Sequence, residues 1–482
     1  MTVVVYFAGL TMPLVGPDEP RYSQVAREMF ERGDWVTPTL AGFHWFEKPA
    51  LLYWLQIGSY NLFGVSEFAA RFGSALFGLG TIVSLYLLGR HIERRAMNDE
   101  AEPVPFANLL ALIAASTVGI IAFAHGASFD IILTFPITAA MVSFFTYDAS
   151  KRSAALVSFY FFIGVALLAK GLIGIVFPAA IAGLYHILIW KLPDRRLLQS
   201  AFWGTLLAVA VAALWYLPMY QRHGFEFIDE FFIQHHFQRF TSNKYLHPQP
   251  FYFFLWVLPL MTIPWLPFFL ATLWKFGRDI VTGDVDRDSI ESRLRIFAAA
   301  WILVPLVFFS FSGSKLPGYI LPAVPAAMIL TSDFVYRFIH KSAVRRQIVL
   351  AFAGGTLLVV TMVALFVAPR FADGDSVKRL FAPSVANSET ADLPVFMLHF
   401  VSHNAEFYAA GRIIREAAGK QKRFHGTKEI ADAMRSRGLT RALVLVPIEH
   451  VNQLLKSADL ASDVRGENGD VVLAEVTTIS AN

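Results

Sequence analysis

The chain has 482 residues, of which 55% are hydrophobic and only 16% are charged. Soluble domains carry about 25% charged residues, so this composition excludes an ordinary soluble enzyme. The net charge of +4 fits the basic loops of a membrane protein and requires no nucleic-acid partner, and the absence of cysteine excludes disulfides and thiolate chemistry.

Apolar segments recur along most of the chain, each roughly 18 to 25 residues long, the length that crosses the hydrocarbon core as a helix. We expect about eleven membrane-spanning helices, at residues 1–15, 68–90, 105–125, 129–147, 154–170, 172–190, 201–220, 251–274, 296–312, 317–335 and 347–369. The first begins at Met1 without a basic leader, and prolines occupy the place of a cleavage site. We therefore favour a first helix with a shortened start over a cleaved signal peptide.

Short basic loops all fall on one side of the membrane if these spans alternate. They contain Arg90, Arg94 and Arg95, Lys151 and Arg152, Lys191, Arg195 and Arg196, Lys275 and Arg278, and Arg337, Lys341, Arg345 and Arg346. By the positive-inside rule that side is the cytoplasm. We expect a multi-pass protein of a bacterial inner membrane, with its active site and C-terminus facing the periplasm.

Two parts of the chain on the periplasmic side are long enough to fold. Segments 22–32 and 51–63 are amphipathic and predict helices that lie along the membrane surface. Residues 370–482 are polar and predict a soluble α/β domain after a catalytic transmembrane domain at 1–369. In that tail we expect strands at 394–400, 442–446 and 470–476 and helices at 404–416 and 427–438. No motif in it carries chemistry, which favours an accessory domain.

Charged side chains gather at the predicted outer ends of the spans. Placing a charge near lipid is energetically costly, so such residues often have a functional role. The side chains at these ends are Asp18, Glu19 and Arg21, then Glu47 and Lys48, Asp130, Lys170, His235, His236 and Arg239, and Lys315. Simpler roles exist for some of them: Lys170 or Lys315 alone can extend to the headgroups, and Asp130 can cap a helix. The adjacent carboxylates of Asp18 and Glu19 repel each other unless a cation or a basic partner joins them.

Five motifs in these stretches resemble the GT-C membrane glycosyltransferases. Asp-Glu-Pro-Arg-Tyr follows the first span, Glu-Lys-Pro comes about thirty residues later, and an aspartate opens the fourth span. Within that family the chain looks closest to the bacterial aminoarabinose transferases, which are related to the protein O-mannosyltransferases. His-His-x-x-Arg-Phe and Lys-Leu-Pro-x-Tyr-Ile-Leu-Pro match the same branch, and the resemblance covers roughly residues 10–330.

The resemblance implies an inverting transfer of a sugar from a polyprenyl phosphate donor. The implied sugar is 4-amino-4-deoxy-L-arabinose, and the implied acceptor is lipid A on the outer membrane face. The implied fold is an all-α polytopic membrane protein of GT-C type, with about eleven transmembrane helices, interfacial helices and the small C-terminal α/β domain. This chain has fewer predicted spans and a shorter tail than the longest members.

Site roles follow from the same motif matches. Asp18 corresponds to the presumed catalytic carboxylate, Asp130 to the second acid, and Lys48 to the lysine that binds the carrier phosphate. The remaining implied contacts to donor phosphate or sugar are Glu19, Arg21, Lys170, Arg239, Lys315 and Tyr319. The implied ligands of a divalent metal, either zinc or magnesium or manganese, are Glu47 with His235 or His236.

Other functions remain open at this stage. A glycosyltransferase of the same fold can act on a protein or on another glycan. A transporter or flippase often has internal repeats and ion sites near the bilayer midplane, whereas this chain has no convincing repeat and its charges gather at one face. The chain could also be an inactive member of the family, but the acids and lysines of the motifs are all present, which argues against this hypothesis.

Overall fold

The computed structural model describes residues 2–96, 104–238, 249–283, 286–386 and 389–479. The chain divides into two compact units, which we call the helical unit and the mixed unit. The helical unit comprises Met1–Ala8, Phe46–Leu55 and Arg71–Thr361, and the mixed unit comprises Gly9–Trp45, Gln56–Ala70 and Met362–Asn482. A domain boundary at residue 369 stays a prediction, but the C-terminal tail folds together with two N-terminal segments.

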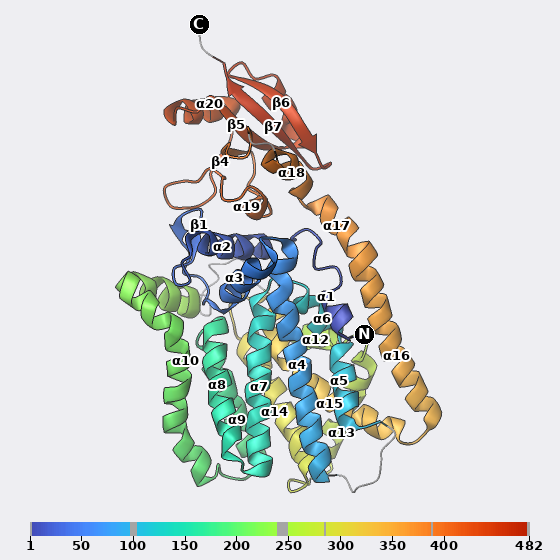
Figure 1. Cartoon of the computed structure of the whole chain (residues 1–482). Helices are drawn as coiled ribbons and strands as arrows, with labels where there is room; N and C mark the ends of the chain where they lie inside the picture. Colours follow the sequence, from blue (N-terminus) through green and yellow to red (C-terminus); the bar gives the residue numbers. More distant parts are fainter. Residues whose placement is uncertain (1, 97–103, 239–248, 284–285, 387–388, 480–482) are drawn as a thin grey trace. The chain divides into compact units, whose positions relative to one another are not determined.

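The helical unit is a bundle of apolar helices that run side by side in Figure 1. Its elements up to η1 are α1 (Thr2–Phe7), α5 (Phe106–Ala115), α6 (Val118–Ala124), α7 (Phe129–Ser150), α8 (Ser153–Lys170), α9 (Ile173–Leu188), α10 (Arg195–Phe227) and the π-helix η1 (Ile228–Gln238). They continue with α12 (Phe253–Met261), α13 (Leu266–Val281), α14 (Ile290–Ser310), the 3-10 helix η2 (Pro317–Ala323), α15 (Val324–Ile339) and α16 (Ala343–Met362). Helices α3 (Leu51–Phe63) and α4 (Glu67–Ala96) belong partly to each unit.

Seven helices of the described part are long and apolar enough to cross a membrane, or eight if α5 and α6, which meet at a 58° bend, form one span. The prediction of a polytopic helical protein is confirmed. The predicted span at 1–15 contains only the short α1, and the one at 251–274 is divided between α12 and α13. The count of about eleven spans stays a prediction.

The two ends of the bundle differ in charge, as the alternation of spans predicts. Asp130 lies at the start of α7 and Asp148 near its end, about 27 Å apart at the rise of an α-helix. At the Asp148 end, Lys151 Nζ lies 2.9 Å from an oxygen of Asp194, which caps α10, and Arg293 of α14 pairs with Asp148. The basic loops that precede α8 and α10 therefore share the end of the bundle opposite Asp130.

The tail contains a five-stranded sheet with strand order β4-β3-β5-β7-β6. Strands β4 (Arg423–Phe424), β3 (Val395–Leu398) and β5 (Arg441–Pro447) are parallel, whereas β7 (Val471–Thr478) and β6 (Leu460–Glu467) join antiparallel. Helix α17 (Ala368–Asp375) continues from α16 through the π-helix η3 (Val363–Val367), and the helices around the sheet are α18 (Lys378–Ala386), α19 (Ala405–Tyr408), α20 (Thr427–Ser436) and α21 (Val451–Leu455). The predicted α/β tail is confirmed.

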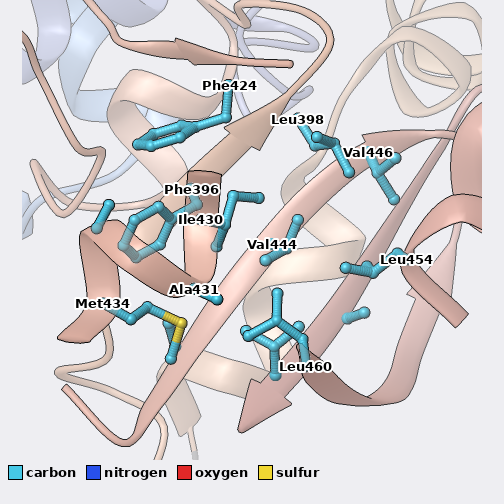
Figure 2. Close-up of a cluster of buried hydrophobic side chains, with 14 of the residues drawn as sticks. Phe396, Leu398, Phe424, Ile430, Ala431, Met434, Val444, Val446, Leu454 and Leu460 are labelled. Atoms are coloured by element: carbon cyan, nitrogen blue, oxygen red, sulfur yellow. The ribbon is translucent and has the colours of Figure 1, made fainter. Parts of the chain in front are cut away.

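Alternation of side chains along the strands gives the sheet two buried faces. Phe396 and Val444 contribute to a cluster that includes Ile430 and Met434 of α20, as Figure 2 shows. Their neighbours turn to the other face, where Met397 joins a cluster that includes residues of α18 and α19. Both faces are covered, so this sheet has a core independent of the membrane.

The predicted surface helices at 22–32 and 51–63 are α2 (Asp18–Arg32) and α3. Tyr60 of α3 donates a hydrogen bond from its hydroxyl to the carbonyl of Ser23 in α2, at 3.1 Å. The short strands β1 (Thr39–Leu40) and β2 (Phe43–His44) follow α2, and their turn is held by the carboxylate of Glu28, which accepts from the Ala41 amide at 2.6 Å. These bonds hold the central part of α2.

Candidate active site

Asp130 lies in the first turn of α7, where negative charge is favourable beside the exposed amides of a helix N-terminus. The helix is capped by Ser128, whose hydroxyl accepts from the Asp130 amide at 3.1 Å. Capping, the simpler role considered for Asp130, is therefore performed by its neighbour. The Asp130 carboxylate is left for a contact between helices.

Lys170, the last residue of α8, forms an ion pair with Asp130, and the two side chains are only 14% and 18% exposed. The ammonium also lies 4.7 Å from the ring centroid of Tyr319 in η2, a cation–π distance. Lys170 thus faces protein groups instead of extending to lipid headgroups. Three of the motif residues, separated by up to 189 positions (319 minus 130), meet here.

Gly318 explains why the Lys-Leu-Pro-Gly-Tyr motif needs a glycine at this point. A Cβ atom at position 318 would overlap the Asp130 carboxylate. The 3-10 helix η2 therefore approaches the acid more closely than any side chain would allow. Sequence reasoning did not single out Gly318, although its place between Pro317 and Tyr319 was visible.

Lys315 is buried, with 7% of its surface exposed. Its ammonium donates to the carbonyls of Ser312, at 2.7 Å, and Gln249, at 3.1 Å. These bonds fold the loop between α14 and η2 and join it to the segment before α12. An ammonium has three donors, and these two bonds use two of them. The donor-phosphate role of Lys315 stays a prediction.

In the mixed unit, α2 begins at Asp18, and the two adjacent carboxylates point to different partners. Asp18 pairs with Arg21 one helical turn later, and its side chain is 49% exposed. Glu19 is buried and accepts a hydrogen bond from the Val15 amide at 3.0 Å. The predicted need for a basic partner is thus met by Arg21, and Glu19 closes the preceding turn. A substrate contact by Glu19 stays a prediction.

Arg21 is more enclosed than its partner, since 19% of its side chain is exposed. Its guanidinium lies 5.3 Å from the ring centroid of Trp45 and 5.7 Å from that of Tyr22. Both distances lie within the range of a cation–π interaction, which attracts the guanidinium to the two rings. Arg21 therefore holds a positive charge beside the exposed carboxylate of Asp18.

Glu47 and Lys48 are half-buried in the helical unit, on the segment that precedes α3. That segment is anchored by Phe46, which is fully buried and whose ring centroid lies 5.0 Å from His223 and 5.8 Å from Phe227 of α10. The anchor restricts the backbone from which both charged side chains extend. Their phosphate and metal roles stay predictions.

His403 of the tail is a residue that sequence reasoning missed. Partial burial lowers its pKa, the positive charge of Arg21 lowers it further, and Glu406 and Asp18 act in the opposite sense. The imidazole is therefore neutral at pH near 7 and lies within the electrostatic reach of the Asp18–Arg21 pair. No local motif marks His403, because Asp18 and Arg21, whose charges act on it, lie near the other end of the chain.

Three predicted site residues cannot be placed. Arg239 lies outside the described residues, as do the side chains of His235 and His236 in η1. Among the described side chains, no group of three or more His, Cys, Asp and Glu residues is arranged to hold a metal ion. Since two of the three predicted ligands fall outside that set, the metal site stays a prediction.

The described residues provide two kinds of chemistry. An exposed carboxylate beside a guanidinium can orient a polar substrate or accept a proton from it. Buried and half-buried lysines at one end of a helical bundle can stabilise negative charge that develops on an oxygen.

Comparison with known families gives a match over residues 7–229 to the family of dolichyl-phosphate-mannose-protein mannosyltransferases. A curated relative from Shewanella sediminis, an undecaprenyl phosphate-alpha-4-amino-4-deoxy-L-arabinose arabinosyl transferase, is 31% identical over 359 residues. The alignment covers 73% of this chain and 62% of the relative. The enzyme of the same name from Serratia proteamaculans is 30% identical, with 66% of this chain and 54% of the relative covered. The chain therefore spans less than two thirds of the length of these relatives.

A crystal structure of ArnT from Cupriavidus metallidurans bound to undecaprenyl phosphate has the same fold. The TM-score is 0.79 at 22% sequence identity, and the superposition covers 98% of this chain and 96% of that one. The family match, the curated relatives and the shared fold agree with the family resemblance seen in the sequence. The chain belongs to the GT-C membrane glycosyltransferases, in the group that contains the aminoarabinose transferases and the protein mannosyltransferases.

Proposed function

We propose that the chain is an inverting glycosyltransferase that moves a sugar from a polyprenyl phosphate carrier to lipid A. The observation that carries this proposal is the meeting of Asp130, Lys170 and Tyr319, three motif residues from three separate elements. The names of the curated relatives support a polyprenyl phosphate donor and 4-amino-4-deoxy-L-arabinose as the sugar. The proposed site faces the periplasm across a bacterial inner membrane, because the basic loops lie at the opposite end of the bundle.

In the proposed reaction, the bond between the sugar C1 and the carrier phosphate oxygen breaks while the acceptor oxygen bonds to C1 from the opposite face. The electron pair of the broken bond stays with the phosphate. Fixed cations aimed at that oxygen lower the barrier, because they need no reorganisation as the charge develops. Lys48 is our first candidate for this contact, and Arg21, Lys170, Arg239 and Lys315 are candidates for further ones.

The role of Asp18 depends on the acceptor group. A hydroxyl acceptor must lose its proton as it attacks, and the Asp18 carboxylate, being exposed, can accept it. A phosphate acceptor on lipid A is already deprotonated, and Asp18 would then orient it or stabilise positive charge on the sugar. In both modes the Asp18 carboxylate acts beside the guanidinium of Arg21, with which it is paired.

A divalent metal at Glu47 and one of the η1 histidines is part of this proposal. Such an ion would add positive charge on the phosphate side of the reaction. Dialysis against a chelator, followed by return of zinc, magnesium or manganese one at a time, tests it. Activity that survives thorough chelation would remove the metal.

The experiment that tests the proposal is sugar transfer by the purified protein in liposomes. A panel of polyprenyl phosphate sugars is supplied with a lipid A acceptor, and both donor consumption and product are measured. We expect transfer of the amino sugar to lipid A. If no donor is consumed even with membrane extract added, the proposed activity is wrong, and a transporter becomes the better hypothesis.

Lys48 offers a sharper test within the same assay. If it binds the carrier phosphate, Lys48→Ala raises the donor KM by about 10- to 100-fold, the range expected for losing a charged hydrogen bond. The melting temperature and the acceptor KM should stay unchanged, because the backbone at this point is anchored by Phe46. Lys48→Arg, which keeps the charge, should retain part of the affinity. An unchanged donor KM would remove Lys48 from the phosphate role.

A protein-directed transfer is the second candidate, and the match to the mannosyltransferase family over residues 7–229 favours it. The two acceptors are separated by extraction, since lipid A partitions into organic solvent and glycoproteins do not. A labelled donor added to membrane extract therefore assigns the acceptor class directly.

A further inference from the structure

The backbone just before Asp18 is held by the tail. Both hydrogen-bonding groups of Leu14 are engaged within the mixed unit: its amide donates to the hydroxyl of Tyr408 at 2.8 Å, and its carbonyl accepts from the side-chain amide of Asn404 at 3.1 Å. Asn404 and Tyr408 lie at the two ends of α19. We call these two bonds the Leu14 clamp.

The clamp is itself fixed by charged and polar partners of the mixed unit. The Tyr408 hydroxyl, which accepts from Leu14, donates to the carboxylate of Glu67 at 3.1 Å, and Lys378 holds the same carboxylate oxygen at 2.7 Å. Burial raises the pKa of Tyr408, so the hydroxyl keeps the proton that it donates. Glu67 and Asn404 are both nearly buried. The clamp is therefore a connected network with its donors and acceptors matched, which makes it rigid.

The chain from Leu14 to Asp18 is short and restrained. The next amide, that of Val15, donates to Glu19 at 3.0 Å. Gly16 adopts a left-handed conformation with φ of +65°, and Pro17 fixes the backbone before α2 begins. Because each link has little freedom, fixing Leu14 also fixes the position and direction of the first turn of α2.

The same part of the tail lies within electrostatic reach of the charged pair. His403 immediately precedes Asn404, and its imidazole is subject to the charges of Arg21 and Asp18. One short segment of the tail thus holds Leu14, just before α2, and carries a histidine that is influenced by the charges in the first turn of α2. A tail that served only as a separate cap would need neither.

We infer that Asn404 and Tyr408 are positioning residues for Asp18, and that the C-terminal domain is part of the machinery of the active site. This inference rests on the proposed transferase activity. Its consequence is that small changes in the tail, far along the chain from Asp18, slow the chemical step while the donor is still bound normally.

The test uses the full-length protein with Tyr408→Phe and, separately, Asn404→Ala. Each variant removes one bond of the clamp. Tyr408→Phe also preserves most of the side-chain volume. Hydrogen exchange is measured on peptides covering residues 10–20, together with kcat and donor KM for transfer in liposomes. The matched control is Arg435→Ala in α20, whose side chain pairs with Asp432 at the exposed surface of the same tail.

We expect exchange in residues 10–20 to accelerate at least tenfold in both variants and kcat to fall about tenfold, with donor KM and the exchange of β3, β5 and β7 unchanged. The control should match the wild type in every measurement. Unchanged exchange in residues 10–20 would show that the clamp is absent. Faster exchange with unchanged kcat would overturn the positioning role.

The two proposals fail in different ways. If wild-type protein transfers no sugar, the proposed function is wrong, and the exchange data still decide whether the clamp exists. If wild type is active and both variants equal it, the proposed function stands and this inference is wrong. Should Asn404→Ala disturb the whole tail, the exchange of β3 reports it, and Tyr408→Phe alone decides.

Discussion

Asp130 and Asp18 are both aspartates in the first turn of a helix, yet their surroundings differ. Asp130, in the helical unit, pairs with Lys170 from another helix, and its side chain is 18% exposed. Asp18, in the mixed unit, pairs with Arg21 of its own helix and is 49% exposed. The two candidate acids are therefore not equivalent.

This difference assigns them different tasks. The Asp130–Lys170 pair is bounded by α7, α8 and η2, and Gly318 allows the last of these to come close. Such an enclosed pair organises the surrounding elements, and removing one member leaves an unpaired charge near lipid. The carboxylate of Asp18 is accessible from outside the protein. We therefore expect Asp18 to act in the chemistry and Asp130 to maintain the geometry.

The largest effect should come from Asp18→Asn. Removing the charge but keeping the shape should lower kcat/KM by about 10²- to 10⁴-fold, the usual contribution of a positioned acid or base. Thermal unfolding in detergent should stay within about 0.5 kcal/mol of the wild type, as for most exposed positions. Activity within tenfold of the wild type would contradict the assignment.

Asp130→Asn should affect both stability and activity. The enclosed Lys170 ammonium loses its counter-ion, which costs about 1 to 3 kcal/mol of unfolding free energy. Combining Asp130→Asn with Lys170→Met should restore part of that stability, because the unpaired Lys170 ammonium is then also removed. It should restore none of the activity, because the geometry that the ion pair maintained is not rebuilt. A double variant as unstable as the single one would show that the pair is not what stabilises this end of the bundle. Thermal unfolding and transfer assays on the same preparations distinguish these outcomes.

Much of this comparison was visible in the sequence, because motif order identified both acids and the lysines. The amphipathic pattern at 51–63 predicted α3 with the same bounds that the structure has. What the sequence could not provide was the partners. Whether Lys170 faces lipid or Asp130 depends on how α7 and α8 are rotated, and no local pattern encodes that rotation.

Errors in the tail have local physical causes. The predicted helix at 404–416 stops after α19, since Ala410 and Gly411 adopt positive φ values of 53° and 76°. Strand β6 was not predicted because it is an edge strand with mostly exposed residues and a register shift between Val464 and Gly466. Edge strands bury little, so their hydrophobic pattern is weak.

Gly318→Ala sharpens the comparison by disturbing Asp130 without changing any charge. The added methyl group overlaps the Asp130 carboxylate, so η2 or α7 must shift, at a cost of about 1 to 3 kcal/mol. Transfer should fall about tenfold, less than for Asp130→Asn, since the ion pair can re-form. Gly183→Ala in α9 is the matched control, because a Cβ there meets nothing within 4 Å. It should be neutral or slightly stabilising, as alanine favours a helix.

The smallest effect concerns Glu475 in β7, a carboxylate that is paired with two arginines but belongs to the tail sheet. Arg441 of β5 and Arg465 of β6 each approach it to 2.6 Å. Burial alone would raise the pKa of Glu475, but hydrogen bonds from Arg465 and Arg441 reverse this, and the pKa lies below its usual value. A carboxyl with a lowered folded pKa stabilises the fold fully above its unfolded pKa, near 4.3, and this stabilisation is lost as pH falls through the folded pKa.

Glu475→Gln should therefore cost about 1 kcal/mol near pH 7, since both arginines are more than a third exposed, and should remove part of the acid sensitivity of β5 to β7. Hydrogen exchange of these strands in the full-length protein, normalised to intrinsic rates between about pH 3 and pH 7, measures both effects. Sugar transfer at pH 7 should not change, because Glu475 holds the sheet and does not take part in the Leu14 clamp. A loss of transfer comparable to that of Tyr408→Phe would mean that any weakening of the tail slows the reaction. The tail would then act on Asp18 through its overall stability, in addition to the organising role of Asp130 and the reacting role of Asp18.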